Sequence, residues 1–358
     1  MLKNHGARVA VLMSGGVDSS VAAALLKKQG YNVTGFFMIL NKSEKAKEAQ
    51  SSAQKIAQFL NIPFYALDLS SLFQKKIIDY LVAGYKSGRT PNPCIVCNKE
   101  IKFGAMLEKA LSFDFDYVAT GHYVKLKAKS EKRKVDHSQL FKAYDTKKDQ
   151  SYFLYTLTQE KLKHLLFPIG DYTKQEVRLI AKKVGLSVYN RKESQDICFL
   201  GGEKMIDFLK KKIKSRAGKI MDINTKKELG CHQGLPFYTL GQRQGIGVGG
   251  TGPYYVVWID SKRNILWVSK DHNDPKIIGK ELIVKNVNWV AGKEPKLPLK
   301  CKVKIRYNQK LADAMIKKVE QGIYKIFFVK SQRAITRGQS AVFYSDEELL
   351  GGGIIKGY

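Results

Sequence analysis

A short loop near the N-terminus has the residue types that bind phosphate. Residues 14–19 read Ser-Gly-Gly-Val-Asp-Ser and follow an apolar run. Glycines let backbone amides approach an anion closely, serines add hydroxyl donors, and a following helix N-terminus favours negative charge. Asp18 would repel bare phosphate, so we expect it to cap the helix or to organise Mg²⁺. The Gly-Lys-Ser/Thr ending of a Walker A loop is missing, and an ordinary strand-to-helix turn is the structural alternative.

A pair of cysteines supplies a second kind of chemistry. Cys94 and Cys97 form a Cys-x-x-Cys within residues 90–100, Thr-Pro-Asn-Pro-Cys-Ile-Val-Cys-Asn-Lys-Glu. The two prolines stiffen a loop that runs into a helix, where the helix dipole and Lys99 are expected to favour the Cys97 thiolate. A structural zinc site is not favoured because there is no second Cys-x-x-Cys. The remaining cysteines are isolated: Cys198, Cys231 and Cys301.

The charge of the chain points to a polyanionic partner. Lys plus Arg number 62 and Asp plus Glu number 32, which gives a formal net charge of +30. This excess is typical of nucleic-acid binding, and it is concentrated in residues 125–148 and 203–227. A solvated basic face is the alternative for each segment.

Length and cysteine content indicate a folded protein of a reducing compartment. The chain has 358 residues, 44% hydrophobic and 26% charged, which suggests two or three globular domains. Five cysteines are too few, and odd in number, for a secreted disulfide framework. The apolar run at residues 9–13 is too short for a signal peptide, and no stretch approaches the roughly 18 residues of a spanning helix. We therefore expect a cytoplasmic protein without a membrane partner.

The first part of the chain alternates strand and helix patterns. Repeated βα units predict an α/β fold, a doubly wound parallel sheet that binds ligands at the carboxyl ends of its strands. Thr173 and Glu176 have capping-box spacing for a helix that ends near Gly185. The expected strands are residues 8–13, 32–39, 63–69 and 117–120, and the expected helices are 19–29, 43–60 and 101–111.

Beyond residue 212, helical periodicity fades and short β-rich segments recur between turns. These segments predict two small all-β modules with a boundary near residues 271–276. Gly245, Gly247 and Gly250 fit a G-x-G-x-x-G pattern, but a β-like run follows them, so dinucleotide binding is not favoured. Examples of these β-rich segments are residues 254–259, 265–269, 282–290, 302–307 and 323–329.

Several blocks resemble known enzymes. Residues 14–19 resemble the SGGVDS loop of the ATP pyrophosphatase superfamily, whose members adenylate a carbonyl oxygen and release pyrophosphate. Six further blocks resemble the bacterial-type tRNA-specific 2-thiouridylase family, in the family's order: residues 90–103, 119–124, 148–153, 193–199, 234–247 and 337–344. The resemblance implies a PP-loop catalytic domain over residues 1–212, a small central β domain over 213–273 and a C-terminal β-barrel over 274–358.

The resemblance also implies roles for individual residues. Cys97 matches the family's nucleophile and Cys198 its persulfide carrier. The ATP site would comprise Leu12, Met13, Ser14, Gly15, Gly16, Val17, Asp18, Ser19, Met38 and Gly121. The target base would contact Asn92, Pro93 and Cys94, and the other tRNA contacts would be His122, Lys148, Asp149, Gln150, Arg306, Tyr307 and Gln339. Many members carry Asp where this chain has Cys94, so an acid/base role does not transfer to that position.

The activity implied is ATP-dependent 2-thiolation of the wobble uridine of tRNA. Transfer of AMP to the C2 oxygen would turn a poor leaving group into a good one, with Mg²⁺ neutralising the phosphates. Sulfur would come from a persulfide on Cys198, loaded by a cysteine desulfurase or a sulfur-carrier protein, with Cys97 attacking or resolving it. One alternative delivers the sulfur from an iron–sulfur cluster held by Cys94, Cys97 and Cys198. The others are a PP-loop ligase acting on a small molecule and a non-catalytic RNA-binding module.

Overall fold

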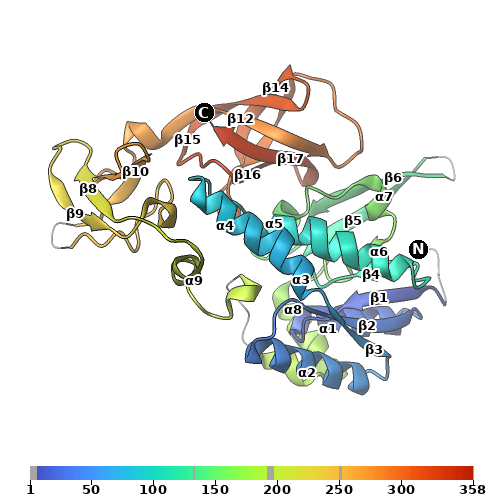
Figure 1. Cartoon of the computed structure of the whole chain (residues 1–358). Coiled ribbons are helices and arrows are strands. Elements are labelled where there is room, and N and C mark those ends of the chain that lie inside the picture. The colour runs from blue at the N-terminus through green and yellow to red at the C-terminus, as the bar shows by residue number, and fades with distance from the viewer. Residues whose placement is uncertain (1–5, 132–133, 192–196, 250–251, 358) are drawn as a thin grey trace.

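The computed structural model describes residues 6–131, 134–191, 197–249 and 252–357. Figure 1 shows an α/β unit in blue and green, a central β-rich unit in yellow, and a C-terminal barrel in orange and red that lies beside both. No helix of the described ranges has the length and apolar character needed to cross a bilayer.

The N-terminal sheet is parallel, and its strand order is β3-β2-β1-β4-β7. Alternate residues of β1 enter opposite cores: Val9 and Val11 pack on one side of the sheet, and Ala10 and Leu12 on the other. A strand buried on both faces is apolar throughout, which is why it could be predicted from the sequence. The strands are β1 (Arg8–Leu12), β2 (Asn32–Ile39), β3 (Phe64–Asp68), β4 (Tyr117–Ala119) and β7 (Leu165–Leu166).

Three helices cover one face of this sheet: α1 (Val17–Lys28), α2 (Glu44–Phe59) and α8 (Lys174–Val184). The predicted capping box at α8 is confirmed, because the Thr173 hydroxyl accepts from the Glu176 amide and the Glu176 carboxylate accepts from the Thr173 amide. Gly185 ends the helix in the left-handed conformation, at φ 86°. The doubly wound α/β fold expected from the sequence is thereby confirmed.

The opposite face carries a long helical segment that contains the Cys-x-x-Cys. The predicted helix over residues 101–111 begins earlier, because α5 (Pro93–Cys97) continues into the π-helical turn η2 (Asn98–Ala105) and then α6 (Met106–Leu111). A second helical segment was not anticipated: α3 (Ser70–Phe73), the π-helical η1 (Gln74–Ile78) and α4 (Asp79–Lys86). Such π-helical segments are rare and often mark functional sites.

The C-terminal unit is a closed antiparallel barrel of six strands, in the order β12-β15-β14-β13-β16-β17, closed by pairing of β12 with β17. The basic segment 125–148 is neither a plain loop nor a helix face, because β5 (Val124–Glu131) and β6 (Lys134–Lys142) form a hairpin that pairs with β17. The strands are β12 (Ile278–Trp289), β13 (Leu299–Lys304), β14 (Ala312–Glu320), β15 (Ile323–Arg333), β16 (Ser340–Ser345) and β17 (Glu348–Gly357).

The central unit is a four-stranded sheet in the order β10-β11-β8-β9. It follows α9 (Met205–Lys212), and its strands are β8 (Gly218–Asp222), β9 (Glu228–His232), β10 (Tyr255–Asp260) and β11 (Ile265–Ser269). Small β modules after an α/β unit were predicted, and this arrangement is confirmed.

Candidate functional site

The phosphate loop joins β1 to α1 at the carboxyl end of the sheet. The Ser19 hydroxyl oxygen accepts from the Ser14 amide at 3.1 Å, and the two hydroxyl oxygens are 3.3 Å apart, so the loop curls around its own side chains. Gly15 requires its small size: its φ is +74°, and a Cβ would come within 2.4 Å of the Ala49 carbonyl oxygen. The Gly15 carbonyl also accepts from the guanidinium of Arg191 at 2.8 Å.

Asp18 does not cap α1, so that expectation is wrong; Gly16 occupies the N-cap without any side-chain bond. Instead the Asp18 carboxylate accepts from the Lys174 ammonium at 2.7 and 2.8 Å and from the Tyr123 hydroxyl at 2.7 Å. The Lys174 side chain is 11% exposed and that of Asp18 is 33% exposed, so the ammonium is largely withdrawn from water and the carboxylate is partly accessible. It ties the first turn of α1 to the first turn of α8.

The other predicted ATP-site residues surround this loop. Gly121 packs directly on it, since a Cβ there would lie 2.6 Å from the Asp18 carbonyl carbon and 2.6 Å from the Ser19 nitrogen. Leu12, Met13 and Val17 are buried, so any contact they make with a nucleotide would come from the backbone. Met38 is half-buried near the carboxyl end of β2.

The local sequence explains the start of the cysteine helix. The Asn92 side-chain oxygen caps α5 by accepting from the amides of Cys94 at 3.1 Å and Ile95 at 3.3 Å, and Pro93 takes the first helical position. Cys97 is the last residue of α5 before the π-helical turn, and it is 7% exposed. Cys94, one turn earlier, is half-buried.

The Cys97 thiolate is not favoured in this arrangement, contrary to the sequence expectation. Burial raises the pKa of Cys97 to about 12, and burial raises that of Cys94 to about 11. The cation that opposes both shifts is Lys102 rather than Lys99, whose ammonium lies 3.7 Å from the Glu100 carboxylate.

Cys198 approaches the same site from a different part of the chain. It is exposed at the start of the short helix η5 (Cys198–Leu200). The next residue, Phe199, packs edge-on against Phe73, with the two ring centroids 5.6 Å apart. Phe199 belongs to the apolar cluster that includes Cys97. The negative charge of a Cys198 thiolate would raise the pKa of both Cys94 and Cys97, so the three sulfurs lie within electrostatic reach of one another.

The three thiols do not fit an iron–sulfur cluster as they stand. In the parts of the chain that are described, no three His, Cys, Asp or Glu side chains approach closely enough to hold a metal ion. The first four residues of the block at 193–199 lie outside the described residues. We therefore derive no step through a cluster.

Several residues predicted to contact tRNA make contacts within the protein. His122 is 9% exposed and Asp149 is 6% exposed; Asp149 accepts from the Ala143 and Ser151 amides at 3.1 Å each. The Gln150 side chain accepts from the Tyr123 amide at 2.9 Å. Tyr307 is half-buried with its ring centroid 4.5 Å from that of Phe153, and Lys148 is half-buried as well.

Two of the predicted tRNA residues connect the units of the chain. The Gln339 amide group donates to the Thr90 carbonyl at 2.8 Å, and the Thr90 amide donates to the Arg337 carbonyl at 2.8 Å. The Arg306 guanidinium donates to the Leu240 carbonyl at 3.0 Å. The barrel therefore holds the loop before the cysteine helix on one side and the central unit on the other.

Sequence reasoning missed two lysines of the site. Lys174 is a cation in the first turn of a helix, where the dipole disfavours positive charge, and this signal could have indicated a buried acidic partner. Lys102 follows Cys97 by five residues, and side chains five residues apart in an α-helix point in different directions. In the π-helical segment, residues at this spacing lie on the same side of the helix.

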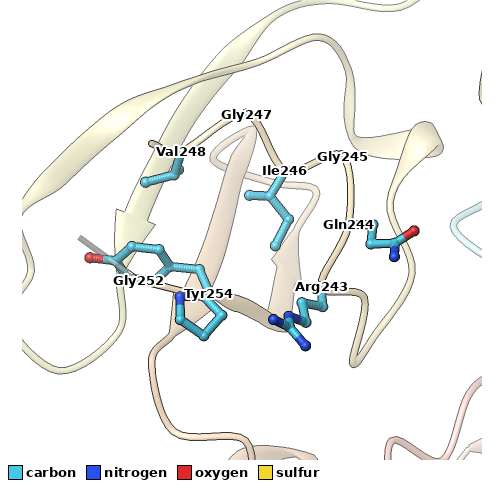
Figure 2. Close-up of a pocket in the computed structure, with 9 residues that line it drawn as sticks. Arg243, Gln244, Gly245, Ile246, Gly247, Val248, Gly252 and Tyr254 are labelled. Carbon is cyan, nitrogen blue, oxygen red and sulfur yellow. The ribbon is translucent and has the colours of Figure 1, made fainter. Parts of the chain in front are cut away.

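A separate cavity of about 440 Å³ lies in the central unit. Figure 2 shows it between the glycine loop and the start of β10, with Ile246 and Tyr254 among its walls and Arg243 at one side. Gly250 of the G-x-G-x-x-G pattern lies outside the described residues, and the loop leads to a strand, not a helix. The lining residues include none of the predicted site residues.

Comparisons with known proteins cover the whole chain. The profile of the tRNA methyl transferase HUP domain matches residues 7–202, that of the tRNA methyl transferase PRC-barrel domain matches 206–270, and that of the aminomethyltransferase beta-barrel domain matches 279–355.

Among curated proteins, the chain is 44% identical to tRNA-specific 2-thiouridylase MnmA 2 of Thermoanaerobacter sp. (strain X514), over 98% of each chain. It is 44% identical to tRNA-specific 2-thiouridylase MnmA of Clostridioides difficile (strain 630), again over 98% of each. Its identity to the Marinomonas sp. (strain MWYL1) protein of the same name is 42%, over 98% of this chain and 92% of that one.

Proposed function

The chain belongs to the tRNA-specific 2-thiouridylase family, as its sequence motifs predicted, and from this premise we propose that it catalyses ATP-dependent 2-thiolation of the wobble uridine of tRNA. The observation that carries the proposal is that a phosphate loop at the carboxyl end of the parallel sheet lies beside the helix that bears Cys94 and Cys97. Gly121 packs on the loop, and the next residue, His122, contacts Lys102 of the cysteine helix, so both halves of the chemistry share one site.

The phosphate loop serves the adenylation half of the reaction. The uridine O2 attacks the α-phosphorus of ATP, the bond to the β-phosphate oxygen breaks, and pyrophosphate leaves. Amides and hydroxyls of residues 14–19 bind the anionic phosphates, and Mg²⁺ enters with ATP as part of the substrate. Asp18 is engaged by Lys174 and Tyr123, so its role is to fix the loop and the neighbouring ammonium.

The cysteines serve the sulfur half. The terminal sulfur of a Cys198 persulfide attacks C2, and AMP departs with the former O2. The Cys97 thiolate then attacks the Cys198 sulfur, breaking the S–S bond and leaving sulfur on C2. A disulfide between Cys97 and Cys198 results, and an external dithiol must supply two electrons to reduce it before the next cycle.

The remaining units and partners follow from this assignment. We assign residues 1–212 to catalysis and residues 213–273 and 274–358 to holding the tRNA, with Asn92, Pro93 and Cys94 near the target base. The net charge of +30 suits an RNA backbone. Lys148, Arg306, Tyr307 and Gln339 are proposed to contact the tRNA. The sulfur donor is a cysteine desulfurase or sulfur-carrier protein, and the reaction takes place in the cytoplasm.

The test is mass spectrometry of tRNA nucleosides from a strain depleted of the protein. We expect 2-thiouridine at the wobble position to disappear and to return when the gene is restored, whereas unchanged 2-thiouridine would defeat the proposal. Purified protein should also catalyse tRNA-dependent exchange of pyrophosphate into ATP. The small-molecule ligase and the non-catalytic RNA-binding module are not favoured, because the family relatives match over nearly the full chain.

A further inference from the structure

Lys102 is held at the cysteine site by a buried histidine. Its ammonium lies 3.4 Å from Nε2 of His122, and Nδ1 of the same ring lies 2.7 Å from the Thr120 hydroxyl. The ring is fixed in the core, with its centroid 5.7 Å from that of Phe103 and 6.3 Å from that of Phe167.

The protonation of this chain of groups follows from its surroundings. Burial lowers the pKa of His122 well below its usual range, and the charge of Lys102 acts in the same direction, so the imidazole is neutral. An ammonium can only donate, so Nε2 accepts from Lys102 and the single ring proton sits on Nδ1. That N–H donates to the Thr120 hydroxyl oxygen. The histidine is thus a fixed acceptor that orients a cation.

The π-helical geometry of the segment places the Lys102 side chain on the same side of the helix as Cys97. In an α-helix, residues five apart point about 140° away from each other. Between Cys97 and Lys102 the helix is π-helical, with a wider turn of i to i+5 hydrogen bonds that brings the two side chains to the same side. The positive charge of Lys102 opposes the effect of burial at both Cys94 and Cys97.

A comparison with Lys99 shows that this placement is specific. Lys99 lies on the same π-helical turn, but its side chain is 56% exposed and lies 3.7 Å from Glu100. Lys102 is half-buried and bonded to His122. The turn therefore carries two lysines, of which one faces solvent and one faces the sulfur site.

We propose that Lys102, oriented by His122 and Thr120, supplies the positive charge that stabilises anionic sulfur at Cys97 during transfer. The role deepens the proposed function and rests on it for its biological meaning. His122 and Thr120 are positioning residues. This role explains why His122, which lies in one of the blocks that resemble the family, is buried. Burial disfavours an anionic sulfur at Cys97, and the charge of Lys102 reduces that penalty.

The test compares two alkylating reagents of similar size and different charge, iodoacetate and iodoacetamide, at one pH. Both react with the same thiolate, so the ratio of their rates cancels the thiolate fraction and reports the local electrostatic potential. Alkylation of Cys97 is followed by peptide mass spectrometry that resolves it from Cys94. The measurement needs no enzymatic activity, so its failure is distinguishable from failure of the proposed function.

We expect Lys102→Gln, which keeps a donor for His122 but removes the charge, to lower the iodoacetate to iodoacetamide ratio by roughly three- to tenfold. Lys102→Arg should retain the wild-type ratio, Lys99→Gln should leave it unchanged, and His122→Gln should give an intermediate fall. Single-turnover sulfur transfer should decline in Lys102→Gln while tRNA-dependent pyrophosphate exchange persists.

An unchanged ratio in Lys102→Gln would overturn the proposal. An equal fall in Lys99→Gln would show that the effect comes from the general charge of the helix. If Lys102→Gln does not fold, the comparison of Lys102→Arg with His122→Gln decides, because only the second displaces the charge.

Discussion

The ammonium of Lys174 lies 2.7 and 2.8 Å from the two carboxylate oxygens of Asp18, although 156 residues separate them in the chain. This pair joins the phosphate loop to α8, and the Tyr123 hydroxyl completes it at 2.7 Å from the same carboxylate. Because Lys174 holds the Asp18 carboxylate, the conformation of the phosphate loop depends on α8, which is far away in sequence.

We predict that Asp18→Asn abolishes pyrophosphate exchange and leaves tRNA affinity nearly unchanged, because the loop addresses ATP while the basic surfaces address the RNA. The variant should also lose about 1–3 kcal/mol of unfolding free energy, since it leaves the Lys174 ammonium largely buried without its counter-charge. Pyrophosphate exchange assays measure the loss of activity, and urea denaturation measures the loss of unfolding free energy.

The double variant Asp18→Asn with Lys174→Met separates the two contributions. It should recover much of the lost stability, because no unpaired charge remains, yet it should stay inactive. Recovery of pyrophosphate exchange in the double variant would show that the pair serves the fold alone.

Substitution at Gly121 should weaken nucleotide binding by displacing the phosphate loop. A Cβ there would lie 2.6 Å from both the Asp18 carbonyl carbon and the Ser19 nitrogen, so Gly121→Ala must push the loop away. We expect at least a tenfold loss in ATP affinity by calorimetry. Gly88→Ala is the matched control for stability at a site with open space, although its φ of +68° adds some strain of its own.

The parts of the fold that follow simple burial patterns were predictable. The central strand β1 is apolar on both faces, and the capping box at Thr173 and Glu176 predicts the start of α8. β14 does not show a strand pattern because several of its residues are lysine or glutamate. β17 does not show one because it contains a run of glycines, which is typical of turns. A closed barrel supplies every strand with neighbours, so weak local preferences suffice there.

The site was predictable in its motifs but not in its charges. Residue types in sequence indicate a phosphate loop and two cysteines, whereas the pairing of Asp18 with Lys174 depends on where α8 packs. Likewise Lys99, which follows Cys97 by two residues, was the natural candidate for a thiolate partner. Because the segment is π-helical, Lys102 and not Lys99 is the lysine that acts on the Cys97 thiol, and no local sequence pattern predicted the π-helical segment.

Stability should decline as the pH falls through the region where histidines protonate in the unfolded chain. Burial lowers the folded-state pKa of His122 well below 6.5, so below that pH the unfolded state binds more protons and is stabilised relative to the folded state. The contribution is absent above the unfolded pKa, where both states are neutral. His122→Gln should therefore reduce the loss of thermal midpoint between pH 7 and pH 5, and an unaltered pH dependence would contradict the assignment.

The affinity for tRNA should fall steeply with salt. Each neutralised phosphate releases counterions and contributes about −0.7 to −0.9 to the slope of log affinity against log salt, so six contacts would give roughly −4 to −5. Filter binding at a series of potassium concentrations measures the slope. Lys148→Ala should reduce its magnitude by about one. A flat response would mean that the charge of +30 reflects composition only.

Cys94 is the position where the family pattern and the chemistry of this chain differ. Burial raises the pKa of its thiol to about 11, and it does not join Cys97 and Cys198 in a set of three ligands within the described ranges. A persulfide relay needs only Cys97 and Cys198. We therefore predict that Cys94→Ala retains most thiolation activity, while Cys97→Ala and Cys198→Ala each abolish it and keep pyrophosphate exchange.

The decisive measurement pairs these activities with the iron content of protein purified without oxygen. Iron-free protein that thiolates tRNA from a persulfide donor would agree with the relay, because sulfur then passes only through cysteine side chains. Stoichiometric iron, a broad absorption at about 400 nm typical of thiolate-bound clusters and an inactive Cys94→Ala variant would together contradict it. That combination would require the three cysteines to close around a cluster, and hence the segment that bears Cys198 to move toward the cysteine helix.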